Sequence, residues 1–216
     1  MAKPVVALVG RPNVGKSTLF NRLAGRRLAV VDDRPGTTRD RLVAEAEWRG
    51  LTFDLVDTGG IDPTGGLRGE PLSLDSADYI QQIRSQAEQA VSGADAVLFL
   101  VDAASGVTPA EHEVAEILRR AQGALSDRRP PPILLVVNHC DNQALRAQAV
   151  EFYELGMGDP YPVSALHGTG TGDLLDRLHD ALGQFAESPD EPETSVRIAI
   201  VGRPNVGKSS LLNRML

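Results

Sequence analysis

The octapeptide Gly-Arg-Pro-Asn-Val-Gly-Lys-Ser occurs twice in the chain, at residues 10–17 and again at residues 202–209. Each copy follows a short apolar run, Val6–Val9 in the first case and Ile198–Val201 in the second. The two copies continue alike, with Leu19, Asn21 and Arg22 answered by Leu211, Asn213 and Arg214. Because the copies are a whole domain length apart, the repeat indicates tandem domains rather than a solenoid of short repeats.

The repeat predicts the division of the chain. Residues 1–185 have the length of one complete first domain. Residues 186–195 are acidic, contain proline and have no apolar periodicity, which is typical of a linker. Residues 196–216 contain a strand, the second copy of the octapeptide and the first turns of a helix. We expect this last piece to be too short for a core of its own, so that the chain is part of a longer protein.

Between the repeats, apolar runs of strand length alternate with segments of helical periodicity. The predicted strands are Val5–Val9, Leu42–Trp48, Thr52–Asp57, Ala96–Val101, Ile133–Asn138 and Tyr161–Val163, and the predicted helices are Lys16–Leu23, Ser76–Val91, Pro109–Gln122, Gln143–Tyr153 and Thr171–Phe185. This alternation predicts an α/β fold of three layers, in which a mainly parallel sheet carries helices on both faces. Ligands of such folds bind at the carboxyl ends of the strands, where the motifs below fall.

The first octapeptide has the composition and the position of a phosphate-binding loop. It follows an apolar strand and opens a helix, so that backbone N–H groups and the helix dipole face an anion. Lys16 would reach the β- and γ-phosphates, and the Ser17 hydroxyl would bind Mg²⁺. A chance glycine turn would not be expected twice after matching strands. The sequence therefore predicts a P-loop NTPase whose nucleotide-binding residues include Gly10, Arg11, Pro12, Asn13, Val14, Gly15, Lys16 and Ser17.

Two further segments could contact the γ-phosphate and its metal ion. Asp57 ends an apolar strand and is followed by Thr58, Gly59 and Gly60. Asp57 can hold the hydration shell of Mg²⁺, and the Gly60 N–H can touch the γ-phosphate, although an ordinary Asp-Gly turn has the same appearance. Thr38, in a Pro-Gly loop, could add a hydroxyl. The predicted metal ligands are Ser17, Thr38 and Asp57.

Base recognition is predicted at the ends of the last two strands. Asp141 can accept hydrogen bonds from N1–H and the 2-amino group of guanine, which adenine lacks, and a site of this kind discriminates by about 10⁴ or more. Asn138 ends the same apolar strand, three residues before Asp141. Ser164 and Ala165 follow the last strand, where a backbone N–H could reach guanine O6.

In order, GRPNVGKST, PGTTRD, DTGG, NHCD and SAL resemble the motifs of the Era-like, translation-factor-related GTPases. The tandem octapeptide resembles the Der (EngA) family of bacterial GTPases, which have two consecutive G domains and a C-terminal KH-like domain. The resemblance covers the whole chain and implies GTP binding and hydrolysis with Mg²⁺, and a role in assembling the large ribosomal subunit. It assigns catalysis to Lys16, Asn13, Thr38 and Gly60, and implies that Asn13 helps bind K⁺. It extends nucleotide binding to Thr58, Gly59, Ile61, His139, Cys140, Gly202, Asn205, Gly207, Lys208 and Ser209.

Two residues depart from the family pattern. His139 stands where the family has a lysine that packs along the base and ribose, so we expect weaker nucleotide affinity with guanine selectivity retained. Ile61 lies near the place of the water-orienting glutamine of Ras-like proteins, and an aliphatic side chain cannot orient water by hydrogen bonding. We therefore expect hydrolysis that is slow without a partner and stimulated by K⁺. Cys140 is expected to be an inert small side chain rather than a reactive thiol.

Composition sets further bounds. A net charge of −7 and a pI near 5.1 argue against a general nucleic-acid-binding surface on this portion. The single cysteine excludes an internal disulfide framework. No apolar run approaches the ~18 residues of a membrane helix, and the start lacks the pattern of a secretory signal. We expect a cytoplasmic protein without a membrane partner.

Three other interpretations remain open at the level of sequence. The chain could be a non-catalytic nucleotide-binding module with a degraded switch, since His139 and Ile61 both depart from the pattern. It could be another Era-like GTPase that acts on tRNA, although the tandem octapeptide speaks against this. A P-loop kinase or ATPase is disfavoured by Asn138 and Asp141.

Overall fold

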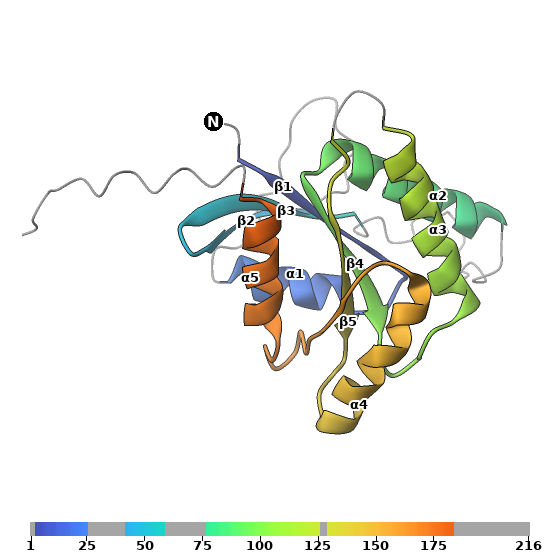
Figure 1. Ribbon diagram of the computed structural model, residues 1–216. Helices are drawn as coiled ribbons and strands as arrows, with labels where there is room; N and C mark the ends of the chain where they lie inside the picture. Colours follow the sequence, from blue (N-terminus) through green and yellow to red (C-terminus); the bar gives the residue numbers. More distant parts are fainter. Residues whose placement is uncertain (1–2, 26–41, 59–76, 126–128, 184–216) are drawn as a thin grey trace, which may run out of the picture. The chain divides into compact units, whose positions relative to one another are not determined.

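The computed structural model describes residues 3–25, 42–58, 77–125 and 129–183 (Figure 1). By its internal contacts the chain divides into Met1–Ala186 and Glu187–Leu216, and all described residues belong to the first unit. The linker at 186–195 and the second-domain fragment at 196–216 lie outside the described residues, so the predicted domain boundaries stay predictions.

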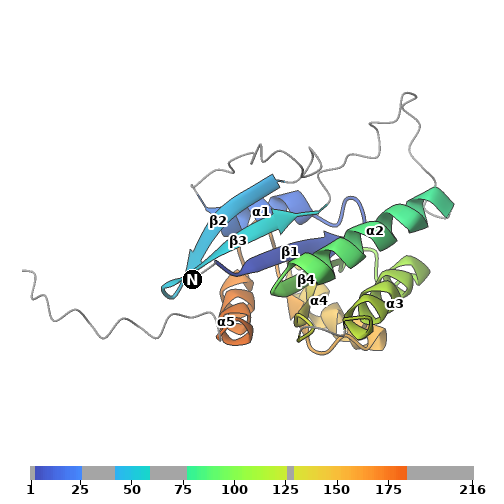
Figure 2. The same ribbon diagram turned by 90° about the horizontal axis from the view of Figure 1, so that it is seen from above.

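Six strands form one sheet in the order β2-β3-β1-β4-β5-β6. Their bounds are β1 Val5–Gly10, β2 Leu42–Trp48, β3 Leu51–Asp57, β4 Ala96–Asp102, β5 Ile133–Asn138 and β6 Pro160–Pro162. Strand β2 pairs with β3 in antiparallel fashion, whereas the other neighbours are parallel, so the carboxyl ends of β1, β3, β4 and β5 meet at one edge (Figure 2).

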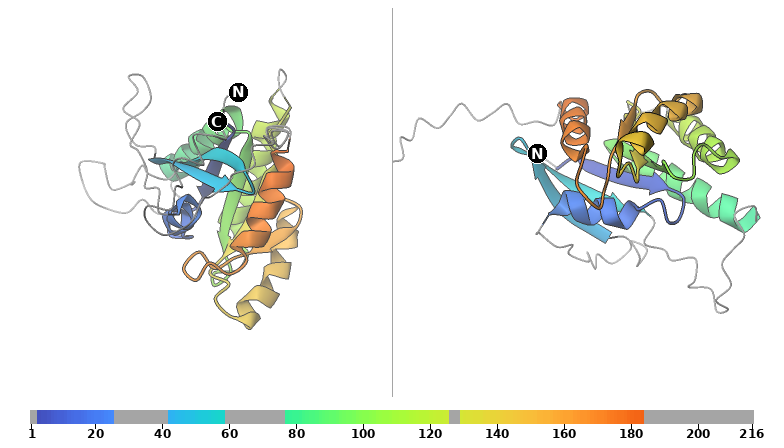
Figure 3. Two further views of the ribbon diagram at one scale, coloured as in Figure 1. Left: turned by 90° about the vertical axis from the view of Figure 1, so that its left-hand side faces the viewer. Right: turned by 90° about the horizontal axis from the view of Figure 1, so that it is seen from below.

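Helices cover both faces of this sheet. On one face, α1 Lys16–Ala24 and α5 Thr171–Ala181 pack on side chains such as Leu8, Leu55 and Leu98. On the other face, α2 Ala77–Gly93, α3 Pro109–Gly123 and the segment after β5 pack on side chains such as Phe99 and Leu135. Figure 3 shows α1 beside the strands β1, β2 and β3. Strands β4 and β5 are buried on both faces, which explains why they are almost continuously apolar. The predicted three-layer fold is confirmed.

The predicted strands agree with the observed ones, with the last strand shifted by one residue toward the N-terminus. The prediction of one helix over Gln143–Tyr153 is wrong. Helix α4 ends at Gln148, and a 3₁₀ segment, η2, runs over Ala149–Leu155. Its buried residues Ala149, Phe152 and Leu155 recur every third position, and a 3₁₀ helix with three residues per turn places all of them on one face.

The other predicted helices lie within two residues of the observed ones at the ends that the structure describes, except that α5 ends at Ala181 instead of Phe185, which is outside the described residues. Within the described parts of the chain, no helix is both long enough and apolar enough to cross a membrane.

Candidate functional site

The phosphate loop joins the end of β1 to the start of α1, and its glycines let it lie unusually close to two neighbouring strands. A Cβ atom on Gly10 would lie 2.4 Å from the carbonyl oxygen of Leu100 in β4, and one on Gly15 would lie 2.2 Å from Nδ2 of Asn138 in β5. Gly15 also has a φ of +88°, a conformation that residues with side chains rarely adopt. Neither position has room for a side chain, which accounts for both glycines of the octapeptide.

Lys16 lies along the loop rather than away from it. Its Nζ donates hydrogen bonds to the carbonyl oxygens of Gly10 at 2.8 Å and of Arg11 at 2.7 Å. Burial lowers the pKa of the Lys16 ammonium, and the negative charge of Asp57 acts in the opposite direction. The ammonium is therefore held at the concave side of a loop that opens a helix, next to the place where an anion would be bound.

Arg11 is directed away from the loop. Its guanidinium pairs with the carboxylate of Glu111 in α3, with Nε to Oε1 at 2.5 Å and with Nη2 on the same oxygen. Glu111 is buried, and its other oxygen accepts from the backbone N–H of Thr108 at 3.1 Å in the capping box of α3. The predicted nucleotide contact of Arg11 is therefore left to its backbone, while its side chain ties the loop to α3.

Ser17, in the first turn of α1, faces Asp57 at the carboxyl end of β3. The hydroxyl of Ser17 donates to Oδ2 of Asp57 at 3.1 Å, and the Thr58 hydroxyl donates to the carbonyl of Leu8 at 2.6 Å. A hydroxyl and a carboxylate are the hard oxygen ligands that Mg²⁺ prefers. Among the described residues no group of three or more His, Cys, Asp or Glu side chains converges. The pair fits Mg²⁺ bound together with a nucleotide.

Several predicted site residues lie outside the described residues. They are Thr38 and the glycine pair with its neighbour (Gly59, Gly60, Ile61), together with the second octapeptide residues Gly202, Asn205, Gly207, Lys208 and Ser209. Their assigned roles stay predictions. Asn13, whose role with K⁺ also stays a prediction, is exposed and has a φ of +65°.

Asn138 connects the phosphate loop with the segment after β6. Its Nδ2 donates to the carbonyl of Val14 at 2.9 Å, and its Oδ1 accepts from the backbone N–H of Ala165 at 3.0 Å. The side chain is fully buried. The Ala165 N–H, which the sequence suggests for guanine O6, is thus already engaged with Asn138. One buried amide therefore joins the phosphate loop to the segment predicted to face the base.

Asp141 is held from the same segment. The hydroxyl of Ser164 donates to Oδ1 of Asp141 at 2.5 Å and accepts from the backbone N–H of His167 at 3.1 Å. Ser164 is fully buried, whereas Asp141 is exposed. The predicted base-recognition carboxylate is therefore at the surface with one oxygen fixed in place. Ser164 orients that carboxylate, a role different from the direct contact with the base predicted for it.

Arg22 of α1 also fixes this segment. Its Nε donates to the carbonyl of Ala165 at 2.9 Å, and its Nη2 donates to the carbonyl of Leu166. The helix that follows the phosphate loop thus contacts the loop predicted to face the base.

His139 and Cys140 differ in their surroundings. His139 is half-exposed, and its Nδ1 lies 2.8 Å from Oδ1 of Asp102 at the end of β4. Cys140 is buried and its thiol donates to the carbonyl of Val137 at 3.3 Å. Burial raises the pKa of the Cys140 thiol. Cys140 is therefore an unreactive core residue, as the sequence suggests, rather than a side chain facing a ligand.

The sequence reasoning missed three residues that hold this site, namely Arg22, Asp102 and Glu111. Arg22 had a signal, because the second copy repeats it as Arg214. Glu111 had a partial one, since an acidic residue three positions after a threonine predicts a capping box but not an ion pair with a loop far away in the sequence. Asp102 ends a strand beside Asn138 in the sheet, and only the topology reveals that neighbour.

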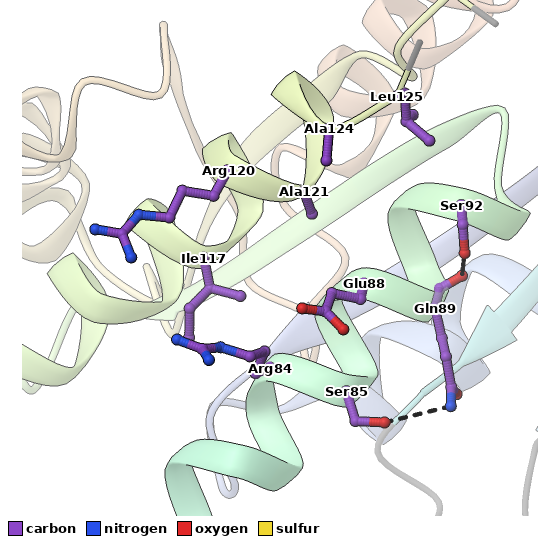
Figure 4. Close-up of a pocket in the computed structure, with 10 residues that line it drawn as sticks. All are labelled: Arg84, Ser85, Glu88, Gln89, Ser92, Ile117, Arg120, Ala121, Ala124 and Leu125. Carbon is purple, nitrogen blue, oxygen red and sulfur yellow. Dashed lines mark hydrogen bonds between the residues drawn. The ribbon is translucent and has the colours of Figure 1, made fainter. Parts of the chain in front are cut away.

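A groove of about 650 Å³ lies elsewhere, between α2 and α3 (Figure 4). It is lined by Arg84, Ser85, Glu88, Gln89, Ser92, Ile117, Arg120, Ala121, Ala124 and Leu125. None of the predicted nucleotide-binding residues lines it. The groove is therefore separate from the site at the carboxyl edge of the sheet.

Comparison with known proteins agrees with this geometry. Residues 5–139 and 197–216 match the family described as 50S ribosome-binding GTPases. GTPase Der of Chloroflexus aurantiacus is 51% identical over 216 residues, a match that covers 100% of this chain and 45% of that protein. The chain thus spans slightly less than half the length of the curated relatives that it matches.

Solved structures give the same assignment of fold. A variant of Era from Aquifex aeolicus, bound to GDP and AlF4⁻, has a TM-score of 0.58 at 25% identity, covering 94% of this chain and 63% of that one. Era in complex with MgGDPNP and a segment of 16S ribosomal RNA has a TM-score of 0.57 at 26% identity, covering 84% of this chain and 57% of that one. With the matched residues spanning most of the chain and the phosphate loop, Asp57, Asn138 and Asp141 lying at one edge of the sheet, the chain belongs to the 50S ribosome-binding GTPase family.

Proposed function

We propose that this chain binds GTP and GDP with Mg²⁺ and hydrolyses GTP, as the first of two consecutive G domains of a longer protein. The observation that carries the proposal is the Asn138 side chain, which joins Val14 of the phosphate loop to Ala165 of the base-recognition segment. A nucleotide would contact both loops at once, so a link that fixes one loop relative to the other would favour its binding. The family match and the similarity to GTPase Der support the same assignment.

The proposed division of roles follows the contacts. The backbone of the phosphate loop and Lys16 bind the phosphates, Ser17 and Asp57 bind Mg²⁺, and Asp141 binds the guanine edge while Ser164 holds it. When bound, Mg²⁺ would neutralise charge on the β- and γ-phosphates. Thr38 and Gly60 are proposed to complete the γ-phosphate contacts.

Hydrolysis is proposed to be slow without a partner and stimulated by K⁺, which would lie beside Asn13 and supplement the charge of Lys16. The support is the sequence alone: Asn13 is the residue of the octapeptide that the family resemblance connects with K⁺, and Ile61 cannot orient water. Phosphate release measured in K⁺ and in Na⁺ at equal ionic strength tests this. Equal rates in the two salts would refute the K⁺ part.

The proposed place of action is the assembly of the large ribosomal subunit in the cytoplasm. The matching family is described by its binding to the 50S ribosome, and the GTPase Der of Chloroflexus aurantiacus is 51% identical to this chain. One structural neighbour, Era, was solved with 16S ribosomal RNA, which shows that a related G domain occurs in an RNA-binding protein. The net charge of −7 favours RNA contacts made mainly by other parts of the longer protein.

The deciding experiment is competition of GTP and of ATP against a fluorescent GDP in K⁺ and Mg²⁺. GTP is expected to compete and ATP is not. Asp141→Asn provides a sharp test, because its amide retains an oxygen for the Ser164 hydroxyl but presents a donor to the base. We expect GDP affinity to fall by about a hundredfold or more, with xanthosine diphosphate, which has a carbonyl in place of the 2-amino group, bound better than GDP. Equal competition by ATP would refute guanine recognition.

A second candidate is a nucleotide-binding module without turnover. The observation that favours it is His139, a half-exposed imidazole beside the phosphate loop where the family has lysine. Single-turnover measurement of phosphate release separates the two candidates, since a module without turnover would bind GTP but release no phosphate. His139→Lys restores the family's residue, and we expect this variant to bind GDP more tightly.

A further inference from the structure

His139 occupies a strained backbone position next to the phosphate loop. Its φ is +61°, which is uncommon for a residue with a side chain and is retained when the surroundings require it. A Cβ atom on Gly15 would lie 3.4 Å from Nε2 of His139, so the imidazole ring borders the loop at the start of α1. Two positions further along the chain is Asp141.

Asp102 holds the opposite edge of the same ring. Its Oδ1 lies 2.8 Å from His139 Nδ1 and accepts from the backbone N–H of Ala104 at 2.9 Å, while its Oδ2 accepts from the Ser105 hydroxyl at 2.9 Å. Asp102 stands beside Asn138 in the register of β4 and β5, so both residues are fixed by the sheet. The carboxylate is thus a rigid acceptor rather than a mobile surface charge.

The contact with Asp102 determines where the imidazole carries its proton. Burial alone would raise the pKa of the Asp102 carboxyl, but the hydrogen bonds from His139, Ala104 and Ser105 together lower it, so this group is ionised at neutral pH. An ionised carboxylate can only accept hydrogen bonds, hence His139 Nδ1 must be the donor. Nε2 is then the nitrogen that faces the phosphate loop, with a lone pair in the neutral ring.

A nucleotide bound as proposed above would lie next to this ring. Its phosphates would be held by the loop that ends at Gly15 and Lys16, and its base by Asp141, so the ribose lies between these points, where His139 stands. The half-exposed ring, with 39% of its side chain accessible, offers a flat face and one nitrogen to that ligand.

We propose that Asp102 is a positioning residue of the nucleotide site, which holds His139 through Nδ1 so that the imidazole forms the wall beside the ribose and purine of a bound guanosine nucleotide. This inference rests on the proposed function. It predicts that Asp102 influences nucleotide binding only through His139.

The experiment is a double-mutant cycle on this chain with fluorescent GDP as the probe. Asp102→Asn replaces the charged acceptor by a neutral one of the same shape and is expected to weaken GDP binding by about threefold to tenfold. In a His139→Phe background the same change is expected to alter binding by less than about twofold, because phenylalanine cannot be held through a ring nitrogen. Ser105→Ala is the matched control. It removes the hydrogen bond at Oδ2 but keeps the charge of Asp102 and its Oδ1 contact with His139, so it should weaken GDP binding less than Asp102→Asn does.

Imidazole ¹⁵N spectra provide a readout that a purely structural role would not move. Of the four histidines, the one whose signal disappears in His139→Phe should carry its proton on Nδ1 when its ring is neutral. Asp102→Asn should shift that histidine toward the Nε2–H form. An Nε2–H ring in the unchanged protein would overturn the inference directly, with or without nucleotide.

The outcomes separate this inference from the proposed function. Equal loss of GDP binding on Asp102→Asn in both backgrounds would mean that Asp102 acts on the fold and not through His139, and would overturn the inference alone. No loss of binding on Asp102→Asn in the unchanged background would do the same. Failure of the unchanged chain to bind GDP at all would overturn the proposed function and this inference with it.

Discussion

At the phosphate loop two glycines let the main chain lie against neighbouring strands, whereas the base-recognition loops are joined mainly by the hydrogen bonds of polar side chains. Gly10 and Gly15 bring the main chain against β4 and β5, and Lys16 bonds to the carbonyls of its own loop. In the other region Asn138, Ser164 and Arg22 each hold a different part of the chain through their polar atoms.

This difference explains at which positions an amino-acid substitution can be tolerated. Gly10 and Gly15 have no room for a side chain, and both recur in the second copy of the octapeptide as Gly202 and Gly207. A network of side chains can absorb a substitution if its neighbours supply a new partner. His139 is such a case, because Asp102 provides the acceptor for its ring.

The largest effect should come from adding one methyl group to the backbone-built region. Gly15→Ala forces a side chain into a φ of +88° and to within 2.2 Å of Asn138 Nδ2, which is buried and cannot move away. We expect GDP affinity to fall by about a hundredfold or more, since the strain of about 1–2 kcal/mol adds to the lost Asn138 bond. Titration with fluorescent GDP measures this.

Gly156→Ala is the control for that change. Gly156 is left-handed like Gly15, with a φ of +62° and a ψ of +30°, but an added Cβ atom would meet only the end of the Arg119 side chain, at 4.0 Å. Its cost should be limited to about 1 kcal/mol of stability with GDP affinity retained. If the two substitutions weakened GDP binding equally, the close approach to Asn138 would not be what the loop requires.

A somewhat smaller effect is expected from Asn138→Asp, which tests the link between the two regions. The change puts a carboxylate oxygen opposite the Val14 carbonyl, where the amide now donates at 2.9 Å, in a fully buried position. The lost donor and the buried charge should lower the free energy of unfolding by about 2–3 kcal/mol. Urea denaturation measures it. Asn142→Asp is the matched change, because Asn142 caps α4 by accepting from Leu145 at the surface, and Asp caps equally well.

Glu111→Gln should have an intermediate effect, because it breaks the tie between the phosphate loop and α3. A glutamine can keep one acceptor, for either Arg11 or the Thr108 N–H, but loses the charge that the half-buried guanidinium faces. We expect about 1–2 kcal/mol in the free energy of unfolding and a measurable loss of GDP affinity.

The control is Glu116→Gln, in the exposed Glu116–Arg120 pair of the same helix. That pair is accessible to water and one helical turn apart, so its loss should cost about 0.5 kcal/mol or less. Equal destabilisation by both substitutions would show that the buried pair does not anchor the loop.

Much of this site could be predicted because its main residues lie at the ends of strands or after the loops that follow them. Asp57 and Asn138 end apolar strands, and Asp141 comes three residues after Asn138. Lys16 and Ser17 begin the helix after the phosphate loop, and a parallel sheet brings such positions to one edge. The helix over Gln143–Tyr153 could not be predicted correctly, since the choice between a 3.6-residue and a three-residue period depended on burial against the sheet.

The supporting contacts could not be predicted for a different reason. Arg11 with Glu111 and Arg22 with Ala165 join residues 100 and 143 positions apart. No local pattern determines such partners, because they depend on which elements become neighbours in the sheet and its helix layers. The sequence therefore identified the residues that gather at this edge of the sheet better than the residues that hold them in place.

The smallest effect is expected from the thiol in the base-recognition region. Cys140 is buried between β5 and the segment after β6, and burial raises the pKa of its thiol. Alkylation by iodoacetamide at pH 8 should be at least about tenfold slower than at Ala104→Cys, an exposed position that serves as control. Because the folded pKa exceeds the ordinary value of 9.0, this group favours the folded state below pH 9 and that preference is lost as the pH rises further. Rapid alkylation at pH 8 would show that the side-chain-built region opens readily, and that its contacts are weaker than those of the phosphate loop.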